Sequence, residues 1–109
     1  MAYDHDLADR IRAQIGPHPA LAEKQLFGGI AFMVAGNMAV GVHGDELMVR
    51  VGEDGHDEAE AKPGARIFDF AGRPMRGWII VAPDGFATDA AFAAWIERGV
   101  RCAESLPSK

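Results

Sequence analysis

The sequence predicts an α+β domain of two layers, in which helices pack on a largely antiparallel sheet. Residues 25–51 contain three short apolar runs separated by two glycine-containing turns, a pattern typical of an antiparallel meander. Residues 3–15 and 88–105 carry apolar side chains at helical spacing. Residues 77–81 form an apolar strand before the turn signal Pro83-Asp84-Gly85. We therefore expect the order helix, three-stranded antiparallel meander, helix, two strands, helix.

The first helix is expected over residues 3–15. Asp4 or Asp6 can cap its start, because a side-chain oxygen there accepts a hydrogen bond from an unpaired backbone N–H. A Gly-Pro pair at residues 16–17 ends it. Its narrow apolar stripe recurs every four residues and consists of Leu7, Ile11 and Ile15.

The meander is expected to contain strands at residues 26–34, 38–42 and 46–51. Gly36-Asn37 and Gly44-Asp45 are the expected turns, because hairpin turns need residues that tolerate a positive φ. Side chains alternate between the two faces of a strand, so one face should form the core. That face carries Ile30, Phe32, Val34, Met38, Val40, Val42, Leu47, Val49 and Val51.

The opposite face of the meander is also apolar, whereas a solvated face is usually polar. Small residues on a sheet face permit close approach by a helix, a second subunit or a ligand. A second layer of the same domain is the first interpretation, and a homodimer contact or a binding surface is the alternative. The candidate interface residues, which lie beside Arg50 on this face, are Phe27, Gly29, Ala31, Met33, Ala39, Gly41 and Met48.

The second half of the chain begins with a short acidic helix expected over residues 52–62. A strand follows at residues 65–70 and another at residues 77–81. Thr88 is the expected cap of the last helix, with Asp89 in its first turn. Gly99 on the apolar face of that helix should allow close packing on the sheet, and Cys102 reads as a small buried hydrophobic residue.

Composition indicates one soluble domain of 109 residues, of which 49% are hydrophobic and 25% charged. The charged N-terminus lacks the apolar core of a signal peptide, and no apolar run approaches the ~20 residues that span a bilayer. Because Cys102 is the only cysteine, an intrachain disulfide is excluded. A reducing compartment and a cytoplasmic location are therefore expected.

The net charge of -5 argues against strong non-specific binding of nucleic acid, which depends on neutralising phosphates. Basic residues are nevertheless concentrated after the acidic segment, at Lys62, Arg66, Arg73 and Arg76. Together with Trp78, the last three form a candidate binding patch, because arginines beside an aromatic ring can hold phosphates or stack on bases. In the alternative interpretation, Trp78 belongs to the core and the arginines pair with the acidic helix.

The usual catalytic motifs are missing, including the G-x-S-x-G elbow, the Walker phosphate loop and G-x-G-x-x-G. His56 lies among acidic residues, which raises the question of a divalent metal site. No second histidine lies one helical turn away, and the spacing is not that of an EF-hand loop. An acidic solvated helix is the better interpretation, so we predict no catalytic residue, no metal ligand and no cofactor.

The order of short motifs resembles the TfoX (Sxy) N-terminal domain family. The resemblance begins with Leu26-Phe27-Gly28-Gly29 and the apolar run that follows, where the family usually has Met at the first position. It continues through Asn37-Met38 and Leu47-Met48-Val49-Arg50. Later parts of the resemblance are Pro63-Gly64-Ala65-Arg66 and Gly72-Arg73-Pro74-Met75-Arg76-Gly77-Trp78.

This resemblance implies a two-layer fold like that of type III secretion chaperones, in a bacterial protein related to regulators of natural competence. Those regulators are thought to act with a cyclic-AMP receptor-type transcription factor, and no enzymatic activity is established for the domain. Because the sequence ends at Lys109, we expect no counterpart of their C-terminal domain. The leading hypothesis is a non-enzymatic regulatory module that binds a protein partner, such as transcription machinery, and forms a homodimer. The alternative is direct contact with nucleic acid through Lys62, Arg66, Arg73 and Arg76.

Overall fold

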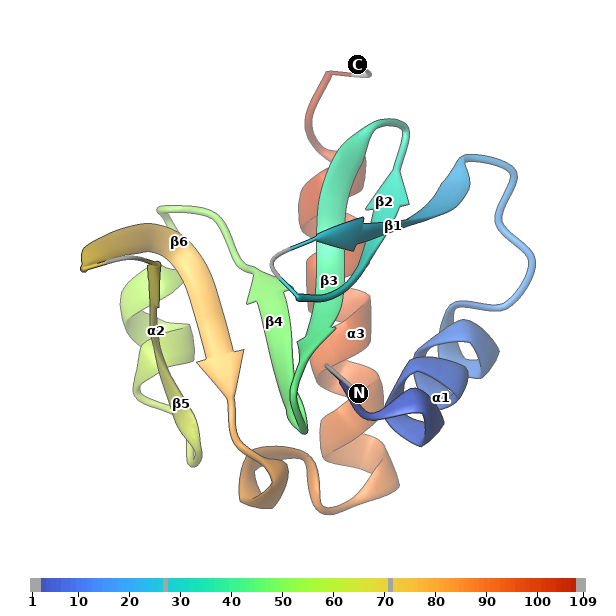
Figure 1. The fold of residues 1–109 in the computed structure, drawn as a ribbon. Helices are drawn as coiled ribbons and strands as arrows, with labels where there is room; N and C mark the ends of the chain where they lie inside the picture. Colours follow the sequence, from blue (N-terminus) through green and yellow to red (C-terminus); the bar gives the residue numbers. More distant parts are fainter. Residues whose placement is uncertain (1–2, 27, 71, 108–109) are drawn as a thin grey trace.

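The computed structural model of the chain describes residues 3–26, 28–70 and 72–107. Within these residues, three α-helices and a 3₁₀ turn accompany a six-stranded antiparallel sheet (Figure 1). The α+β class is therefore confirmed. The elements are α1 (His5–Ile15), β1 (Leu21–Leu26), β2 (Gly29–Val34), β3 (Asn37–His43), β4 (Glu46–Arg50), α2 (His56–Glu60), β5 (Ala65–Phe70), β6 (Arg73–Val81), η1 (Pro83–Phe86) and α3 (Asp89–Glu104).

The strand order in the sheet is β1-β2-β3-β4-β6-β5, and every neighbouring pair is antiparallel. The first four strands form a continuous meander. The β5–β6 hairpin then adds its second strand beside β4, so that β5 and β1 are the two edges. Strands far apart in the sequence therefore share one sheet, in which residues of β6 lie next to residues of β4.

The predicted three-stranded meander was wrong because a fourth strand precedes it. The chain turns at Gly28, where φ is 75°, so the expected strand at residues 26–34 is divided between β1 and β2. The sequence of β1, LAEKQL, is largely polar because this edge strand is mostly exposed, and it therefore lacks an apolar alternation. The acidic helix is also shorter than residues 52–62, since α2 covers only His56–Glu60.

The turn between β2 and β3 consists of Ala35 and Gly36, not of Gly36 and Asn37 as predicted. Both turn residues have positive φ, 52° at Ala35 and 83° at Gly36. Asn37 instead begins β3 and is buried, with its side-chain amide donating a hydrogen bond to the carbonyl of Pro107, 2.9 Å away. The predicted turn at Gly44-Asp45 is confirmed by the pairing of His43 with Glu46.

The main core lies between one face of the sheet and the helices. Leu7 and Ile11 of α1, together with Trp95 and Ile96 of α3, belong to the same buried cluster as the sheet residues. The helix α3 runs behind β3 and β4 in Figure 1. The sheet contributes Ile30, Phe32, Val40, Val42, Leu47, Val49, Ile79 and Val81 to this cluster, and Val51, directly after β4, belongs to it as well.

The predicted close packing at Gly99 is confirmed. A Cβ atom built on Gly99 would lie 2.5 Å from the carbonyl oxygen of Ala39, closer than any carbon can approach. The absence of a side chain therefore brings the backbone of α3 against β3. Thr88 caps this helix as predicted, since its hydroxyl oxygen accepts from the backbone N–H of Ala91 at 3.1 Å.

A β-bulge changes the predicted assignment of residues to the two faces of β3. Phe32 pairs with Val40 and Met33 pairs with Met38, so Ala39 is an extra residue without a partner on β2. Two expectations are corrected by this shift. Met38 leaves the helix side of the sheet for the opposite face. Ala39 packs towards α3, in a cluster with Val34 and Ala103, so it is not an interface residue of the opposite face.

Candidate functional site

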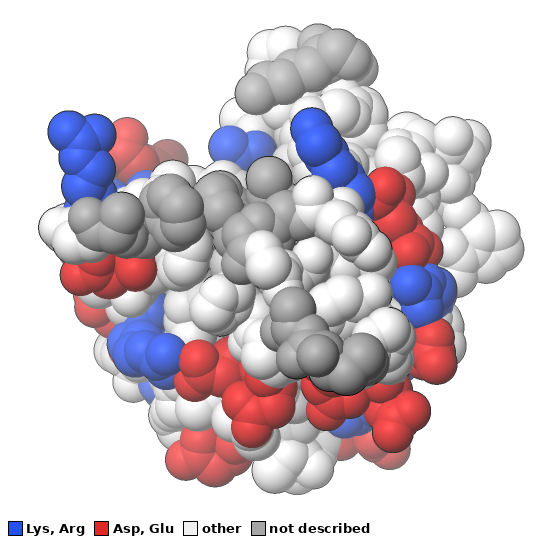
Figure 2. Space-filling model, viewed as in Figure 1, with Lys and Arg blue, Asp and Glu red and all other residues white. Residues whose placement is uncertain are grey.

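The face of the sheet turned away from the helices carries a second apolar cluster, which we call the outer cluster. Its buried members are Ala31, Met38, Met48, Phe68 and Ile80, and its partly buried margin is formed by Met33, Met75 and Trp78. All of them belong to strands, from β2 through β6. Figure 2 views this face and shows uncharged side chains around the residues drawn in grey, with acidic side chains gathered along the lower edge.

Methionine dominates the outer cluster. Four of the five methionines of the sequence belong to it. Gly41 lies beneath two of them, since a Cβ atom there would be 3.0 Å from the Cε atoms of both Met38 and Met48. Methionine side chains are flexible and polarizable and can adapt to partners of different shape, which is why they are common at adaptable binding surfaces.

The predicted interface residues have different outcomes in the structure. Ala31, Met33 and Met48 belong to the outer cluster, with Gly41 beneath it. Gly29 is buried against the backbone of β3, where a Cβ atom would be 2.0 Å from the carbonyl oxygen of Val42. Ala39 belongs to the helix side, as described above, and Phe27 lies outside the described residues.

Four members of the outer cluster were not predicted from the sequence. Met38 was assigned to the wrong face because the bulge at residue 39 has no signature in the apolar pattern. Phe68, Met75 and Ile80 were missed because the sequence does not show that β6 adds beside β4. The apolar alternation of β5 and β6 indicated strands but not their neighbours.

Arg50 is the charged residue at the outer cluster. Its guanidinium lies 4.6 Å from the centre of the Trp78 ring, a cation–π distance. One of its N–H groups donates to the carbonyl of Met38 at 3.4 Å. Among the residues that the structure describes, no carboxylate forms an ion pair with Arg50. A positive charge therefore lies on an apolar surface without a local counter-charge.

Three residues of the predicted basic patch form ion pairs with separate carboxylates of the same chain. Arg66 makes a two-point contact with Glu46, each N–O distance being 2.8 Å. Arg76 pairs with Asp57 of α2 at 3.0 Å. These guanidiniums lower the pKa of both carboxyl groups through direct hydrogen bonds. Trp78 belongs to the outer cluster, where the guanidinium beside its ring is that of Arg50.

The remaining two cations of the predicted patch, Lys62 and Arg73, differ in whether they form an ion pair within the described residues. Lys62 pairs with Glu58, their N–O distance being 3.1 Å. Glu58 also accepts from Arg98, and the two cations lower its pKa to about 2. Arg73 is exposed at the start of β6 and forms no ion pair within the described part of the chain. The structure thus assigns carboxylate partners to Lys62, Arg66 and Arg76.

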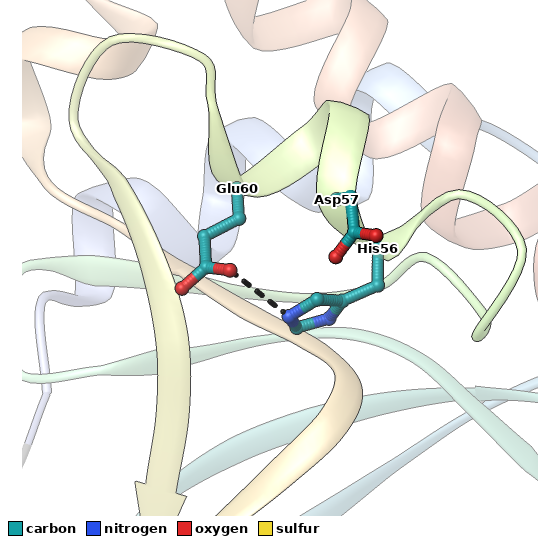
Figure 3. Close-up of side chains that lie close together, drawn as sticks. All are labelled: His56, Asp57 and Glu60. Atoms are coloured by element: carbon teal, nitrogen blue, oxygen red, sulfur yellow. Dashed lines mark ion pairs between the residues drawn. The ribbon is translucent and has the colours of Figure 1, made fainter.

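The acidic segment also contains a cluster with the composition of a metal site. One ligand atom each from His56, Asp57 and Glu60 lie within 4.8 Å of one another, at the start and end of α2 (Figure 3). The imidazole of His56 is buried, with 1% of its surface exposed. Its Nε2 atom is 3.3 Å from a carboxylate oxygen of Glu60 but makes no hydrogen bond within the described structure.

The hydrogen bond that the His56 side chain makes in the described structure argues for a structural role. Its Nδ1 atom accepts from the backbone N–H of Gly77 at 2.9 Å, so Nδ1 carries no proton. In the neutral imidazole the proton is then on Nε2, which faces Glu60 and lacks the free lone pair that a metal ligand needs. Metal-bound histidines usually donate from their second nitrogen, whereas here that nitrogen accepts. His56 therefore has a structural role in this cluster, because its hydrogen bond links α2 to β6.

Cys102 is half-buried on α3, close to Gly52. Burial raises the pKa of its thiol, which disfavours the thiolate form that acts as a nucleophile. Cys102 was predicted to be a small buried hydrophobic residue, whereas in the structure its side chain is only half-buried. None of the helices described by the structure is long and apolar enough to cross a bilayer.

Comparison with known proteins gives one match, to a family. The TfoX N-terminal domain matches residues 13–103, nearly the whole chain. No curated protein and no solved structure matches the chain. The matched span begins within α1 and ends within α3, so it includes all six strands and both walls of the main core. The chain therefore belongs to the TfoX N-terminal domain family.

Proposed function

We propose that the protein is a non-enzymatic regulatory module that binds a protein partner through the outer cluster. The observation that carries this proposal is a methionine-rich apolar face formed entirely by strands. Membership of a family named for a competence regulator supports a regulatory role. The structural hydrogen bond between His56 and the backbone of Gly77 and the raised pKa of Cys102 support a function without catalysis.

The positive charge of Arg50 at the outer cluster indicates what kind of partner would bind there. Arg50 lacks a carboxylate partner within the described structure and lies beside Trp78 and the methionines. A docking segment that combines apolar side chains with an aspartate or glutamate would supply both the burial and the missing counter-charge. The proposed occupant is therefore an acidic, apolar segment of another protein, such as a component of the transcription machinery.

Selection of displayed random peptides on the purified protein tests this proposal. Peptides that bind should combine acidic and apolar residues and should shift the ε-methyl NMR signals of Met33, Met38, Met48 and Met75. Arg50→Glu should weaken such peptides by roughly tenfold or more, because a favourable charge contact becomes repulsive. Arg73→Glu provides a control with the same charge change at the exposed end of β6.

Three results would contradict the proposal. Selected peptides could lack acidic residues, or they could bind Arg50→Glu as tightly as the wild type. Light scattering could instead show a stable dimer that Arg50→Glu and Met33→Lys dissociate, in which case a second copy occupies the face. Homodimerisation would then be the correct interpretation of the outer cluster.

Direct binding of nucleic acid has less support as the alternative function. Three of the four cations assigned to it already pair with carboxylates of the same chain. This alternative expects affinity for an oligonucleotide that falls steeply with salt and that weakens in Arg73→Ala and Arg76→Ala. Fluorescence anisotropy at two salt concentrations distinguishes it from binding of the acidic peptide.

A further inference from the structure

A cavity of about 350 Å³ lies on the helix side of the molecule, away from the outer cluster. Its walls are the exposed side of α3, the 3₁₀ turn η1 and the loop between α2 and β5. The volume falls in the range of small-molecule sites, which is roughly 300 to 1,000 Å³. Most of the lining is apolar and includes Pro63, Ala91, Ala94 and the ring of Trp95.

The floor of this cavity is held rigidly. The indole N–H of Trp95 donates to the carbonyl of Gly85 at 3.2 Å, and the carbonyl of Gly64 accepts from the N–H of Ala82 at 2.8 Å. The two glycines lie in contact, since a Cβ atom on Gly64 would be 2.8 Å from the nitrogen of Gly85. The loop and η1 are thereby locked together, so the cavity is preformed.

Small side chains on α3 keep the cavity open. Ala91 and Ala94 of α3 line it together with Ala87, which directly follows η1, and longer side chains at these positions would fill the space. These alanines and Trp95 form an apolar wall that suits a flat or branched hydrocarbon group. The wall alone does not specify a ligand, but its charged rim does.

The charged rim consists of Lys62 and Arg98, which both hold the carboxylate of Glu58. Arg98 also donates to the carbonyl of Gly55 at 3.2 Å, which fixes the position of its guanidinium. The structure therefore shows the two cations binding a carboxylate. The side chain of Glu58 is 61% exposed and can leave for solvent at little cost, as is usual for exposed ion pairs.

The charge balance of the lining selects among anions. Lys62 and Arg98 contribute two positive charges, and Asp84 contributes one negative charge without a cationic partner among the described residues. The lining is thus net positive by one charge once Glu58 moves away. We propose that this cavity binds a small organic monocarboxylate, with its carboxylate at Lys62 and Arg98 and its apolar body against Trp95. The site is independent of the protein-binding function proposed above.

NMR of the two tryptophan indole N–H groups tests this site directly. Trp95 lines the cavity and Trp78 lies on the opposite face, so each signal reports on one region. Phenylacetate at millimolar concentration should shift the Trp95 signal in a saturable manner and leave the Trp78 signal unchanged. Phenylacetamide, which has the same shape without the charge, should bind at least roughly tenfold more weakly.

Variants of the rim and the wall make the test specific. Glu58→Gln removes the internal competitor and should tighten phenylacetate binding by roughly threefold. Lys62→Gln and Arg98→Gln should each weaken it by roughly tenfold. Ala91→Met fills the cavity and should abolish binding, whereas Ala90→Met, on the same helix but outside the cavity lining, should leave it unchanged.

Several outcomes would overturn the proposal. One is a Trp95 signal that does not respond to phenylacetate, or that responds equally to phenylacetamide. Another is an equal response to inorganic phosphate, which would show that the rim attracts any anion. Retained binding in Ala91→Met, in a variant whose NMR spectrum is otherwise that of the folded protein, would place the ligand elsewhere.

Discussion

His56 shows how one buried side chain can connect two elements of this fold. The backbone N–H of Gly77 lies inside β6, and Nδ1 of His56 is its acceptor at 2.9 Å. Gly77 has φ of 94°, and its carbonyl accepts from the N–H groups of both Val51 and Gly52. The histidine therefore supports an irregular point in β6 where the backbone itself provides no further partner for that N–H.

Substitutions of His56 separate this structural role from metal binding. The amide oxygen of asparagine lies near the position of Nδ1, whereas glutamine places its polar atoms near Nε2. We expect His56→Gln to lower the free energy of unfolding by about 2 kcal/mol, because the N–H of Gly77 is left without an acceptor. His56→Asn should be less destabilising by about 1 kcal/mol. Urea unfolding at constant pH measures both.

The opposite ranking of the two variants would contradict the structural role. So would a rise in the melting temperature of the wild type on addition of zinc that is absent in His56→Asn. Either result would show that Nε2, not Nδ1, is the functional atom of this histidine.

At the scale of elements, the turn between β2 and β3 contains local strain. Ala35 has φ of 52°, a left-handed conformation that residues with a Cβ atom rarely adopt. It is followed by Gly36 at φ of 83°, and two consecutive residues with positive φ are characteristic of a tight hairpin turn for which Asn-Gly is preferred. The backbone conformation of the turn therefore suits a tight hairpin, but alanine at its first position tolerates that conformation less well than asparagine would.

Ala35→Asn should stabilise the protein by about 0.5–1 kcal/mol, because asparagine tolerates the left-handed conformation better than alanine. The midpoint of urea unfolding measures this gain. Ala22→Asn, in the exposed edge strand β1, is the matched control and should be neutral or slightly destabilising. An equal gain at both positions would show that relief of turn strain is not the cause.

Over the whole molecule, an acidic protein holds its sheet together partly by ion pairs between distant segments. Glu46 of β4 binds Arg66 of β5 across the intervening strand β6. The hydrogen bonds from Arg66 lower the pKa of Glu46 below its ordinary value of 4.5. Because the pKa is lower in the folded state, the ion pair stabilises the protein above pH 4.5. This stability is lost as the pH falls through the folded-state value.

Glu46→Gln tests this linkage. At neutral pH the variant should be less stable than the wild type by no more than about 1 kcal/mol, since the pair is partly exposed. The difference should shrink as the pH is lowered below 4.5, because the carboxyl group is then protonated first in the unfolded state, and in the folded state only when the pH reaches its lowered pKa. Unfolding in urea at a series of pH values measures it. Asp45→Asn changes the same charge in the adjacent turn and should show no such dependence, whereas a parallel trend in both variants would refute the role of Arg66.

The arrangement of the helices explains why the two faces of the sheet differ in how they are covered. Helices cover one face and form the main core with it, while the outer cluster is composed of strand residues alone. Burial within the outer cluster is substantial for Ala31 and Met48, whereas Met33, Met75 and Trp78 remain partly accessible. The accessible residues are therefore at the margin of the cluster, where Arg50 lies over the ring of Trp78 and where we expect a partner to dock.

The sequence by itself determined the fold class, the last helix and most of the meander, because these depend on local periodicity and on turn residues. The cap at Thr88, the close approach at Gly99 and the turn at Gly44-Asp45 have local signatures, and the structure confirms each. The family resemblance rests on local motifs of the same kind, and the match over residues 13–103 confirms it.

Only the tertiary structure decided the composition of the outer cluster and the partners of the charged residues. The bulge at Ala39 reverses the side of Met38 without changing the apolar pattern, and the position of β6 beside β4 depends on contacts between distant segments. The pairing of Arg66 with Glu46 likewise joins β5 to β4 across a strand. Such features depend on which strands become neighbours, and this choice follows from burial over the whole chain rather than from any short stretch of it.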